Sequence, residues 1–169
     1  MAPRIPRDAY ATTATINMAD DFIAQAKSVL QTEINELVNL TGRIGPEFTQ
    51  AVNILREGLA HRGKIIVIGV GKSENIATKI TATLNSTGAP AVVLNCQNAL
   101  HGDLGIMAEG DTVLALSYSG ETTELLNLLP HLKRRATAII AFTGKPDSAL
   151  ATNSDVVLDV SGENEACPL

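Results

Sequence analysis

The sequence is poor in residues that recognise bases or sugar rings by stacking. Aromatic residues make up 3% of its 169 residues and tryptophan is absent, so stacking is not the expected mode of ligand recognition. The 13 basic residues are outnumbered by 18 acidic ones, and with a net charge of −5 nucleic acid is not an expected partner. The basic cluster Lys133-Arg134-Arg135 is therefore interpreted as a solvated helix end.

Cysteines are also few, and long hydrophobic runs are missing. Cys96 and Cys167 show neither the spacing of metal ligands nor the pattern of a disulfide framework, and nothing indicates a metal ion or another cofactor. No apolar segment follows Arg4 and Arg7 as a signal peptide requires, and no run is long enough to cross a membrane. We therefore expect a cytoplasmic protein without a membrane partner, although the short N-terminus leaves an organelle transit peptide open.

From Lys64 onward, apolar runs alternate with amphipathic segments. The runs predict strands at 64–69, 91–95, 112–117, 137–143 and 155–160, and the amphipathic segments predict helices at 72–86, 121–134 and about 147–153. Repeated strand–helix–strand units indicate an α/β fold with a five-stranded parallel sheet that is covered on both faces. Pro130 lies inside the second of these helices, where we expect a kink or an early end.

Two helices are predicted before the first strand. Residues 1–16 lack periodicity and are interpreted as a tail, whereas Asn17 is a candidate helix cap with Asp20 in the first turn. The apolar faces of the two helices are formed by Phe22, Ala26, Leu30, Leu37 and Leu40, and by Phe48, Val52, Leu55 and Leu59. These faces could cover the sheet or pair with another subunit. The last strand also needs a cover. Either the N-terminal helices supply it, a partner chain supplies it, or the sequence is a fragment of a longer protein.

Two turns rich in hydroxyl groups each follow a strand and open a helix. Residues 117–123 read SYSGETT and residues 69–73 read GVGKS. Free amide groups at a helix N-terminus attract anions, and the hydroxyls add donors, so the turns suit a phosphate group. An ordinary helix cap would explain one such turn, but two occur. Ile66 and Glu74 stand where a P-loop and a dinucleotide fingerprint need small residues, which excludes both motifs.

A third candidate segment, residues 97–109, has no strand or helix period and contains Asn98, His101 and Asp103. A loop of this length after a strand is often functional. In parallel sheets, ligands bind beyond the carboxyl ends of the strands, near the switch point of the strand order. Both turns and this loop follow strands, so all three are predicted to lie at that edge.

Together these segments resemble the sugar isomerase (SIS) domain, and among its members the arabinose 5-phosphate isomerases. The resemblance extends from about Gly63 to the end of the chain, so the SIS domain is placed at residues 17–169. It is carried by GVGKS at 69–73, LHGDLG at 100–105, SYSGET at 117–122, TGKPDS at 143–148 and EACPL at 165–169. It implies a flavodoxin-like fold, and a homodimer or homotetramer.

The resemblance also implies roles for single residues. Ser73, Ser117, Ser119 and Thr122 would hold the substrate phosphate, and Lys72, His101, Glu121 and Glu165 would be the catalytic groups. The implied reaction interconverts ribulose 5-phosphate and arabinose 5-phosphate through an enediol, for lipopolysaccharide precursor synthesis. It needs a base, an acid and a donor to the enediolate. Which glutamate is the base stays open. The alternative is a non-catalytic SIS module that senses a phosphosugar, although such a module would lose the acid–base residues.

The sequence departs from the family in several places. Tyr118 replaces an asparagine, and Glu74 and Asn75 replace a Gly-His pair. The Glu74 charge at a helix N-terminus is expected to weaken phosphate binding. The family's later active-site histidine and its CBS modules lie beyond the sequence, so we expect a chain of this length to bind substrate but to isomerise it slowly.

Overall fold

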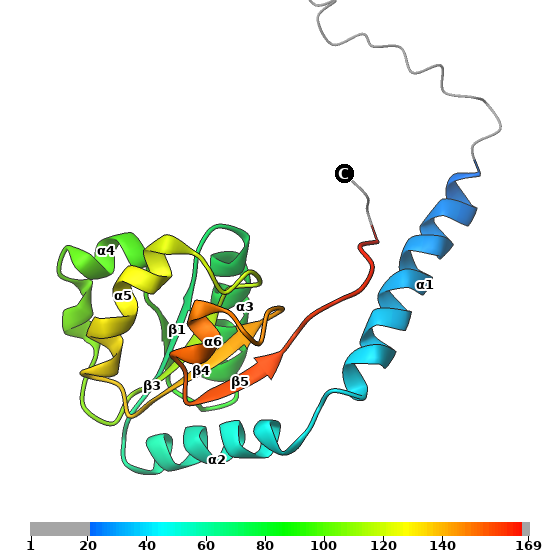
Figure 1. Cartoon of the computed structure of the whole chain (residues 1–169). Coiled ribbons are helices and arrows are strands. Elements are labelled where there is room, and N and C mark those ends of the chain that lie inside the picture. The colour runs from blue at the N-terminus through cyan, green and yellow to red at the C-terminus, as the bar shows by residue number, and fades with distance from the viewer. Residues whose placement is uncertain (1–20, 167–169) are drawn as a thin grey trace, which may run out of the picture.

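Five parallel strands form one sheet in the order β2-β1-β3-β4-β5 (Figure 1). This computed structural model describes residues 21–166. The strands are β1 (Ile65–Gly69), β2 (Ala91–Val93), β3 (Thr112–Leu116), β4 (Ala138–Thr143) and β5 (Val156–Asp159). The predicted five-stranded parallel sheet is therefore confirmed, and its strand order is that of flavodoxin-like folds.

The helices are α1 (Phe22–Thr41), α2 (Pro46–Ala60), α3 (Lys72–Ser86), α4 (Cys96–Leu100), α5 (Thr123–Lys133) and α6 (Ala149–Thr152). The prediction of a structureless segment at 97–109 is wrong, because the chain there forms α4 and a 3₁₀ helix at Asp103–Ile106. Both are too short to produce a helical period. Only the cap is visible in the sequence, where the Asn95 side chain accepts hydrogen bonds from the backbone N–H groups of Gln97 and Asn98.

Side chains of each central strand alternate between two cores, one on each face of the sheet. In β1, Ile66 and Ile68 belong to the core under α4, α5 and α6, whereas Ile65 and Val67 belong to the core under α2 and α3. All four are buried. Both faces of the sheet are therefore covered, as the continuous apolar runs predict.

The two N-terminal helices have different positions. Helix α2 packs against β5, with Leu55 and Leu59 beside the core that contains Val156. This helix supplies a cover for the last strand. Helix α1 extends away from the sheet (Figure 1) and has no buried residue. The Asp21 side chain caps α1, and the predicted Asn17 cap and the tail at 1–16 lie outside the described residues.

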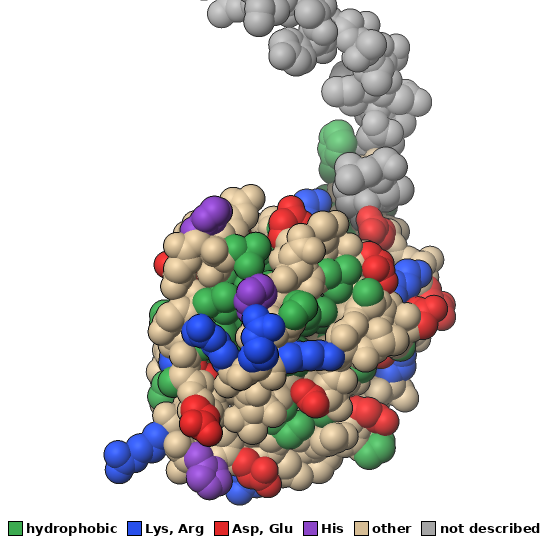
Figure 2. Space-filling model, turned by 60° about the vertical axis from the view of Figure 1, so that its left-hand side comes forward, with side chains coloured by type: hydrophobic (Ala, Val, Ile, Leu, Met, Phe, Trp, Pro, Cys, Tyr) green, Lys and Arg blue, Asp and Glu red, His purple; other side chains and the backbone are tan. Residues whose placement is uncertain are grey.

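The basic cluster is engaged with the protein itself. Figure 2 shows Lys and Arg side chains gathered around a histidine on one face. Arg134 Nη2 lies 2.9 Å from His131 Nδ1, Lys133 Nζ donates to Asn153 Oδ1 at 2.9 Å, and Arg135 Nη1 donates to the Leu104 carbonyl at 2.8 Å. These contacts agree with a solvated helix end.

Within residues 21–166, no helix has both the length and the apolar character that crossing a membrane would require.

Candidate active site at the carboxyl edge of the sheet

The two turns rich in hydroxyl groups follow neighbouring strands. β1 and β3 pair in parallel, with Gly69 opposite Leu116 at their carboxyl ends. After β1 the chain continues to β2 on one side, and after β3 it continues to β4 on the other side. The turns therefore flank the switch point of the strand order, where ligands bind in open α/β sheets.

The turn after β1 depends on two glycines. A Cβ atom on Gly69 would lie 2.6 Å from the backbone carbon of Ser73, so only glycine lets α3 start this close to the strand. Gly71 has a φ of +59°, which side chains rarely adopt. Helix α3 then begins with Lys72, which is exposed, and Ser73, which is half-buried. The structure thus presents both predicted residues at a helix N-terminus.

The turn after β3 is held together by its own hydroxyl groups. Ser117 is buried, and its Oγ lies 2.8 Å from Thr122 Oγ1 and accepts a hydrogen bond from Gly120 N–H at 3.1 Å. Ser119 is exposed, and its Oγ accepts from Glu121 N–H at 3.2 Å. Thr122 precedes α5 without capping it through its side chain. The N-terminal amides of α5 therefore stay available to an anion beside these hydroxyls.

Glu121 joins this turn to the start of α6. Its Oε1 accepts a hydrogen bond from Ala149 N–H at 2.7 Å, and the Gly120 carbonyl accepts from Leu150 N–H at 3.0 Å. Glu121 is exposed at the carboxyl edge of the sheet, directly beside the hydroxyl groups of the turn in sequence.

A polar cavity of about 140 Å³ opens beside the first turn. It is lined by Glu74, Asn95, Cys96 and Glu124 among others, and none of the eight predicted site residues lines it. Glu74 Oε1 accepts a hydrogen bond from Asn95 Nδ2 at 2.8 Å. Burial, with the charges of Glu74 and Glu124, raises the pKa of the Cys96 thiol to about 11. In the sequence, Glu74 excludes a dinucleotide fingerprint and predicts repulsion of a phosphate, but its hydrogen bond to Asn95 is not predicted. The one signal in the sequence was Asn95 itself, a residue type that often caps helices, directly before α4.

The remaining predicted residues lie farther apart. His101 follows α4, on the side of the edge strand β2, and is exposed. Glu165 follows β5 at the opposite edge of the sheet, in a segment that runs toward α1 (Figure 1). It lines a groove of about 620 Å³ together with Tyr118 of the second turn. The structure thus places the turn of Ser117, Ser119, Glu121 and Thr122 beside the Lys72–Ser73 turn. It does not bring His101 and Glu165 into one pocket.

Among residues 21–166, no three His, Cys, Asp or Glu side chains gather closely enough to hold a metal ion.

Comparison with known proteins assigns this architecture to a family. The SIS domain family matches residues 58–168, more than half of the chain. The chain therefore belongs to the SIS domain family. It is 44% identical over 149 residues to the arabinose 5-phosphate isomerase KdsD of Pseudomonas aeruginosa, covering 88% of this chain and 45% of the relative. To the arabinose 5-phosphate isomerase GutQ of Escherichia coli K12 it is 42% identical over 152 residues, which is 90% of this chain and 46% of GutQ. The chain thus spans less than half the length of these relatives.

Solved structures agree with this assignment. The protein c3406 of E. coli CFT073, in complex with arabinose 5-phosphate, matches 87% of this chain and 77% of its own, with a TM-score of 0.80 and 36% identity. The Vibrio vulnificus NanR protein complexed with ManNAc-6P matches 88% of this chain and 54% of its own, with a TM-score of 0.68 and 20% identity. This second likeness shows a shared fold only.

Proposed function

We propose that the protein is an aldose–ketose isomerase that interconverts D-ribulose 5-phosphate and D-arabinose 5-phosphate. The observation that carries the proposal is the pair of hydroxyl-bearing turns at the switch point between β1 and β3. Relatives named arabinose 5-phosphate isomerase, at 42–44% identity, support the choice of sugar. Supply of a lipopolysaccharide precursor and a cytoplasmic location are proposed from the resemblance alone.

The proposed chemistry uses the residues around this edge. Ser73, Ser119, Thr122 and the N-terminal amides of α3 and α5 hold the phosphate, and Ser117 shapes the turn and adds a donor. Glu121 and Glu165 are the candidate carboxylates that move a proton between neighbouring carbons through an enediol. Lys72 stabilises the negative oxygen of that intermediate. His101 is assigned to proton transfer between the two oxygens by the resemblance alone, because the single chain does not place it in one pocket with Glu165.

A non-catalytic phosphosugar sensor remains the second candidate. It would use the same phosphate turn, and the NanR structure shares the fold at 20% identity. The presence of Lys72, His101, Glu121 and Glu165 favours the isomerase, because a sensor does not need acid–base groups. A turnover assay on ribulose 5-phosphate decides between them. Formation of arabinose 5-phosphate supports the isomerase, whereas saturable binding without turnover supports the sensor.

Phosphate binding at the turn is tested by substitution and calorimetry. The double variant Ser117→Ala/Ser119→Ala removes two donors, each worth roughly 1.5–3 kcal/mol to a charged acceptor. We expect arabinose 5-phosphate to bind at least about tenfold more weakly. The single variant Ser119→Ala leaves the bonds from Ser117 to Gly120 and Thr122 intact and isolates the exposed hydroxyl. Ser86→Ala, at the far end of α3, is the control, and an unchanged dissociation constant in the double variant would place the site elsewhere.

We also propose that the chain self-assembles into a dimer or tetramer. Six large apolar side chains of α1 are more than half exposed, namely Phe22, Ile23, Leu30, Ile34, Leu37 and Val38. Such a continuous apolar face is expected to be buried in an assembly. Sedimentation should give a mass two or four times the 17.8 kDa of one chain, and Ile23→Glu/Leu30→Glu should reduce it to that of a monomer. A compact monomer of the unsubstituted chain at micromolar concentration would contradict the proposal.

A further inference from the structure

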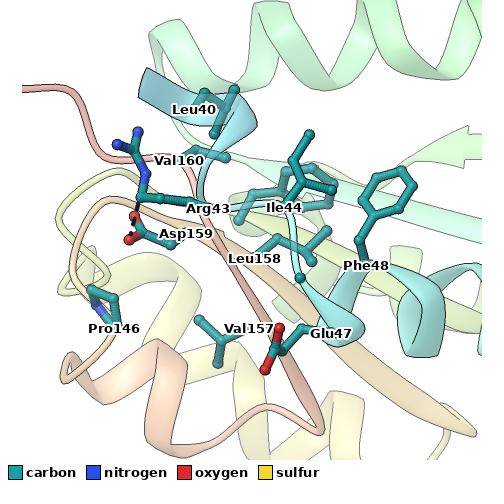
Figure 3. Close-up of a pocket in the computed structure, with 12 residues that line it drawn as sticks. Leu40, Arg43, Ile44, Glu47, Phe48, Pro146, Val157, Leu158, Asp159 and Val160 are labelled. Atoms are coloured by element: carbon teal, nitrogen blue, oxygen red, sulfur yellow. Dashed lines mark ion pairs between the residues drawn. The ribbon is translucent and has the colours of Figure 1, made fainter. Parts of the chain in front are cut away.

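The segment after β5 is fastened to α1 rather than to the sheet. Its last backbone bond to the sheet region joins Val160 N–H to the Thr143 carbonyl at 3.0 Å. Beyond it, Arg43, which follows α1, donates to the Ser161 carbonyl and pairs with Asp159 at 3.8 Å. Figure 3 shows the Arg43 and Asp159 side chains pointing toward each other beside an apolar pocket. Arg43, just after α1, thus contacts the last residue of β5 and the start of this segment.

Further along the segment, Glu36 holds the next residues. Its Oε2 accepts from Glu163 N–H at 3.0 Å, and its Oε1 accepts from the backbone N–H and the side-chain amide of Asn164, both at 3.0 Å. Hydrogen bonds to a carboxylate are stronger than those between neutral groups. Glu36 lies within α1 and Arg43 lies two residues after its end at Thr41, so this part of the chain holds the segment at two points.

The segment also contacts the predicted phosphate turn. Tyr118 Oη accepts a hydrogen bond from Gly162 N–H of this segment at 3.3 Å. The backbone of Tyr118 is itself held by Gly144, after β4, whose N–H donates to the Tyr118 carbonyl at 2.9 Å. Glu36, Tyr118 and Glu165 line one groove. The backbone immediately before Glu165 is therefore fixed on one side by α1 and on the other by the turn that carries Ser117 and Ser119.

We propose that Glu36 is a positioning residue, which orders residues 163–165 and so places the Glu165 carboxylate relative to the phosphate turn. The catalytic part of this inference rests on the proposed isomerase function. Helix α1 has no buried residue, and its polar contacts with this segment are made through Glu36. The hydrogen bonds that Glu36 accepts from Glu163 and Asn164 hold the pKa of its carboxyl below the usual range, and the bond from the Glu163 N–H contributes most.

The test compares Glu36→Ala, Glu36→Gln and the control Glu33→Ala. Glu33 is on the same helix and lines the same groove. In Glu36→Ala we expect amide hydrogen exchange at Glu163 and Asn164 to accelerate at least tenfold, and kcat on ribulose 5-phosphate to fall at least tenfold. KM should change less than about threefold, because the phosphate turn is untouched. Glu36→Gln, which keeps one acceptor oxygen, should lie between, and Glu33→Ala should match the unsubstituted chain.

Two results would overturn the inference. Unchanged exchange at Glu163 and Asn164 in Glu36→Ala would show that the anchor does not order the segment. Faster exchange with unchanged kcat would show that the order is not used to place Glu165. If the unsubstituted chain does not turn over ribulose 5-phosphate, the proposed function fails instead, and the exchange rates alone then decide whether Glu36 orders these residues.

Discussion

Gly120 is closely packed within the hydroxyl-rich turn after β3. Its φ is +65°, and a Cβ atom there would lie 1.9 Å from Ser148 Oγ and 3.0 Å from Thr143 Oγ1. Ser148 is buried and caps α6, so it cannot easily move away. The turn after β3 and the start of α6 are therefore packed as one unit.

We predict that Gly120→Ala destabilises the protein by about 2–4 kcal/mol, from backbone strain and a steric clash together. Gly88→Ala is the matched control, because Gly88 also has a positive φ, +87°, but a Cβ atom there would meet nothing within 4 Å. Urea unfolding of both variants gives the comparison. Equal losses of unfolding free energy would mean that the contact with Ser148 does not matter.

At the same scale, the sequence identified the hydroxyl groups of the turn but not their surroundings. A run of Ser, Gly, Glu and Thr at a strand-to-helix junction predicts an anion site from local chemistry alone. Whether a hydroxyl is buried, as in Ser117, or exposed, as in Ser119, depends on how the turn packs against β4 and α6. That packing involves residues more than twenty positions away and has no local pattern.

Helix α5 continues through Pro130 to Lys133, so the expected early end does not occur. The ring removes one backbone donor, which leaves the Leu126 carbonyl without its intrahelical partner. Leu128, Leu129 and Leu132 are buried in the core around this position. Tertiary packing therefore holds the last turn of the helix in place despite the proline.

We predict that Pro130→Ala stabilises the protein by about 1 kcal/mol or more. Alanine restores the missing hydrogen bond and has the higher helix propensity. It also raises the conformational entropy of the unfolded chain, which offsets the gain by about 0.4–1 kcal/mol. Thermal unfolding should show a higher midpoint. The exposed helix position Asn127 offers a control, since Asn127→Ala changes propensity without adding a backbone bond. A lower midpoint for Pro130→Ala would mean that the proline ring itself is needed for packing.

The elements that the sequence predicts well are those in which the apolar pattern repeats over many residues. The helix expected at 72–86 has those bounds in the structure, because Ile76, Ile80 and Leu84 mark one face through its whole length. Helix α4 has five residues and cannot show such a period. The apolar face of α1 predicts the helix itself, but not that the helix extends away from the sheet, since periodicity does not reveal which surface a face meets.

At the scale of the whole molecule, the strand order explains why the candidate site was only partly predictable. Repeated strand–helix units place every loop after a strand at the carboxyl edge, and this puts the two hydroxyl-rich turns after the neighbouring strands β1 and β3. The strand order then separates His101, beyond β2, from Glu165, beyond β5. The position of Glu165 also depends on Glu36, which lies 127 residues before Glu163 in the chain. No motif in the sequence indicates that pairing.

At the amino ends of the strands, the buried carboxylate of Asp111 holds neighbouring strands together. Asp111 Oδ1 accepts from Lys64 N–H at 2.9 Å, and its Oδ2 accepts from Lys64 Nζ at 2.7 Å and from Ala108 N–H at 2.8 Å. Its carbonyl accepts from Thr137 N–H at 2.8 Å. One residue thus connects the starts of β1, β3 and β4, and its loss is expected to affect the stability of the entire sheet.

The charge of Asp111 links this stability to pH. Burial acts to raise the pKa of the carboxyl, but the bonds from Ala108 and Lys64 outweigh burial and hold the pKa below its usual range. The unfolded chain, with an ordinary aspartate pKa of about 3.9, therefore takes up the proton first as the pH falls. The stabilisation is fully present above about pH 5 and is lost as the pH falls toward the lower pKa of the folded state.

We predict that Asp111→Asn lowers the unfolding free energy at pH 7 by about 1–3 kcal/mol, because the lysine is left facing a neutral amide. The stability of this variant should also decline less between pH 5 and pH 3 than that of the unsubstituted chain. Urea unfolding across this pH range measures both effects. Asp147→Asn, at an exposed position, is the control for the loss of one negative charge. If the unfolding free energy of Asp111→Asn fell as steeply between pH 5 and pH 3 as that of the unsubstituted chain, the titration of Asp111 would not be what connects the stability of the sheet to pH.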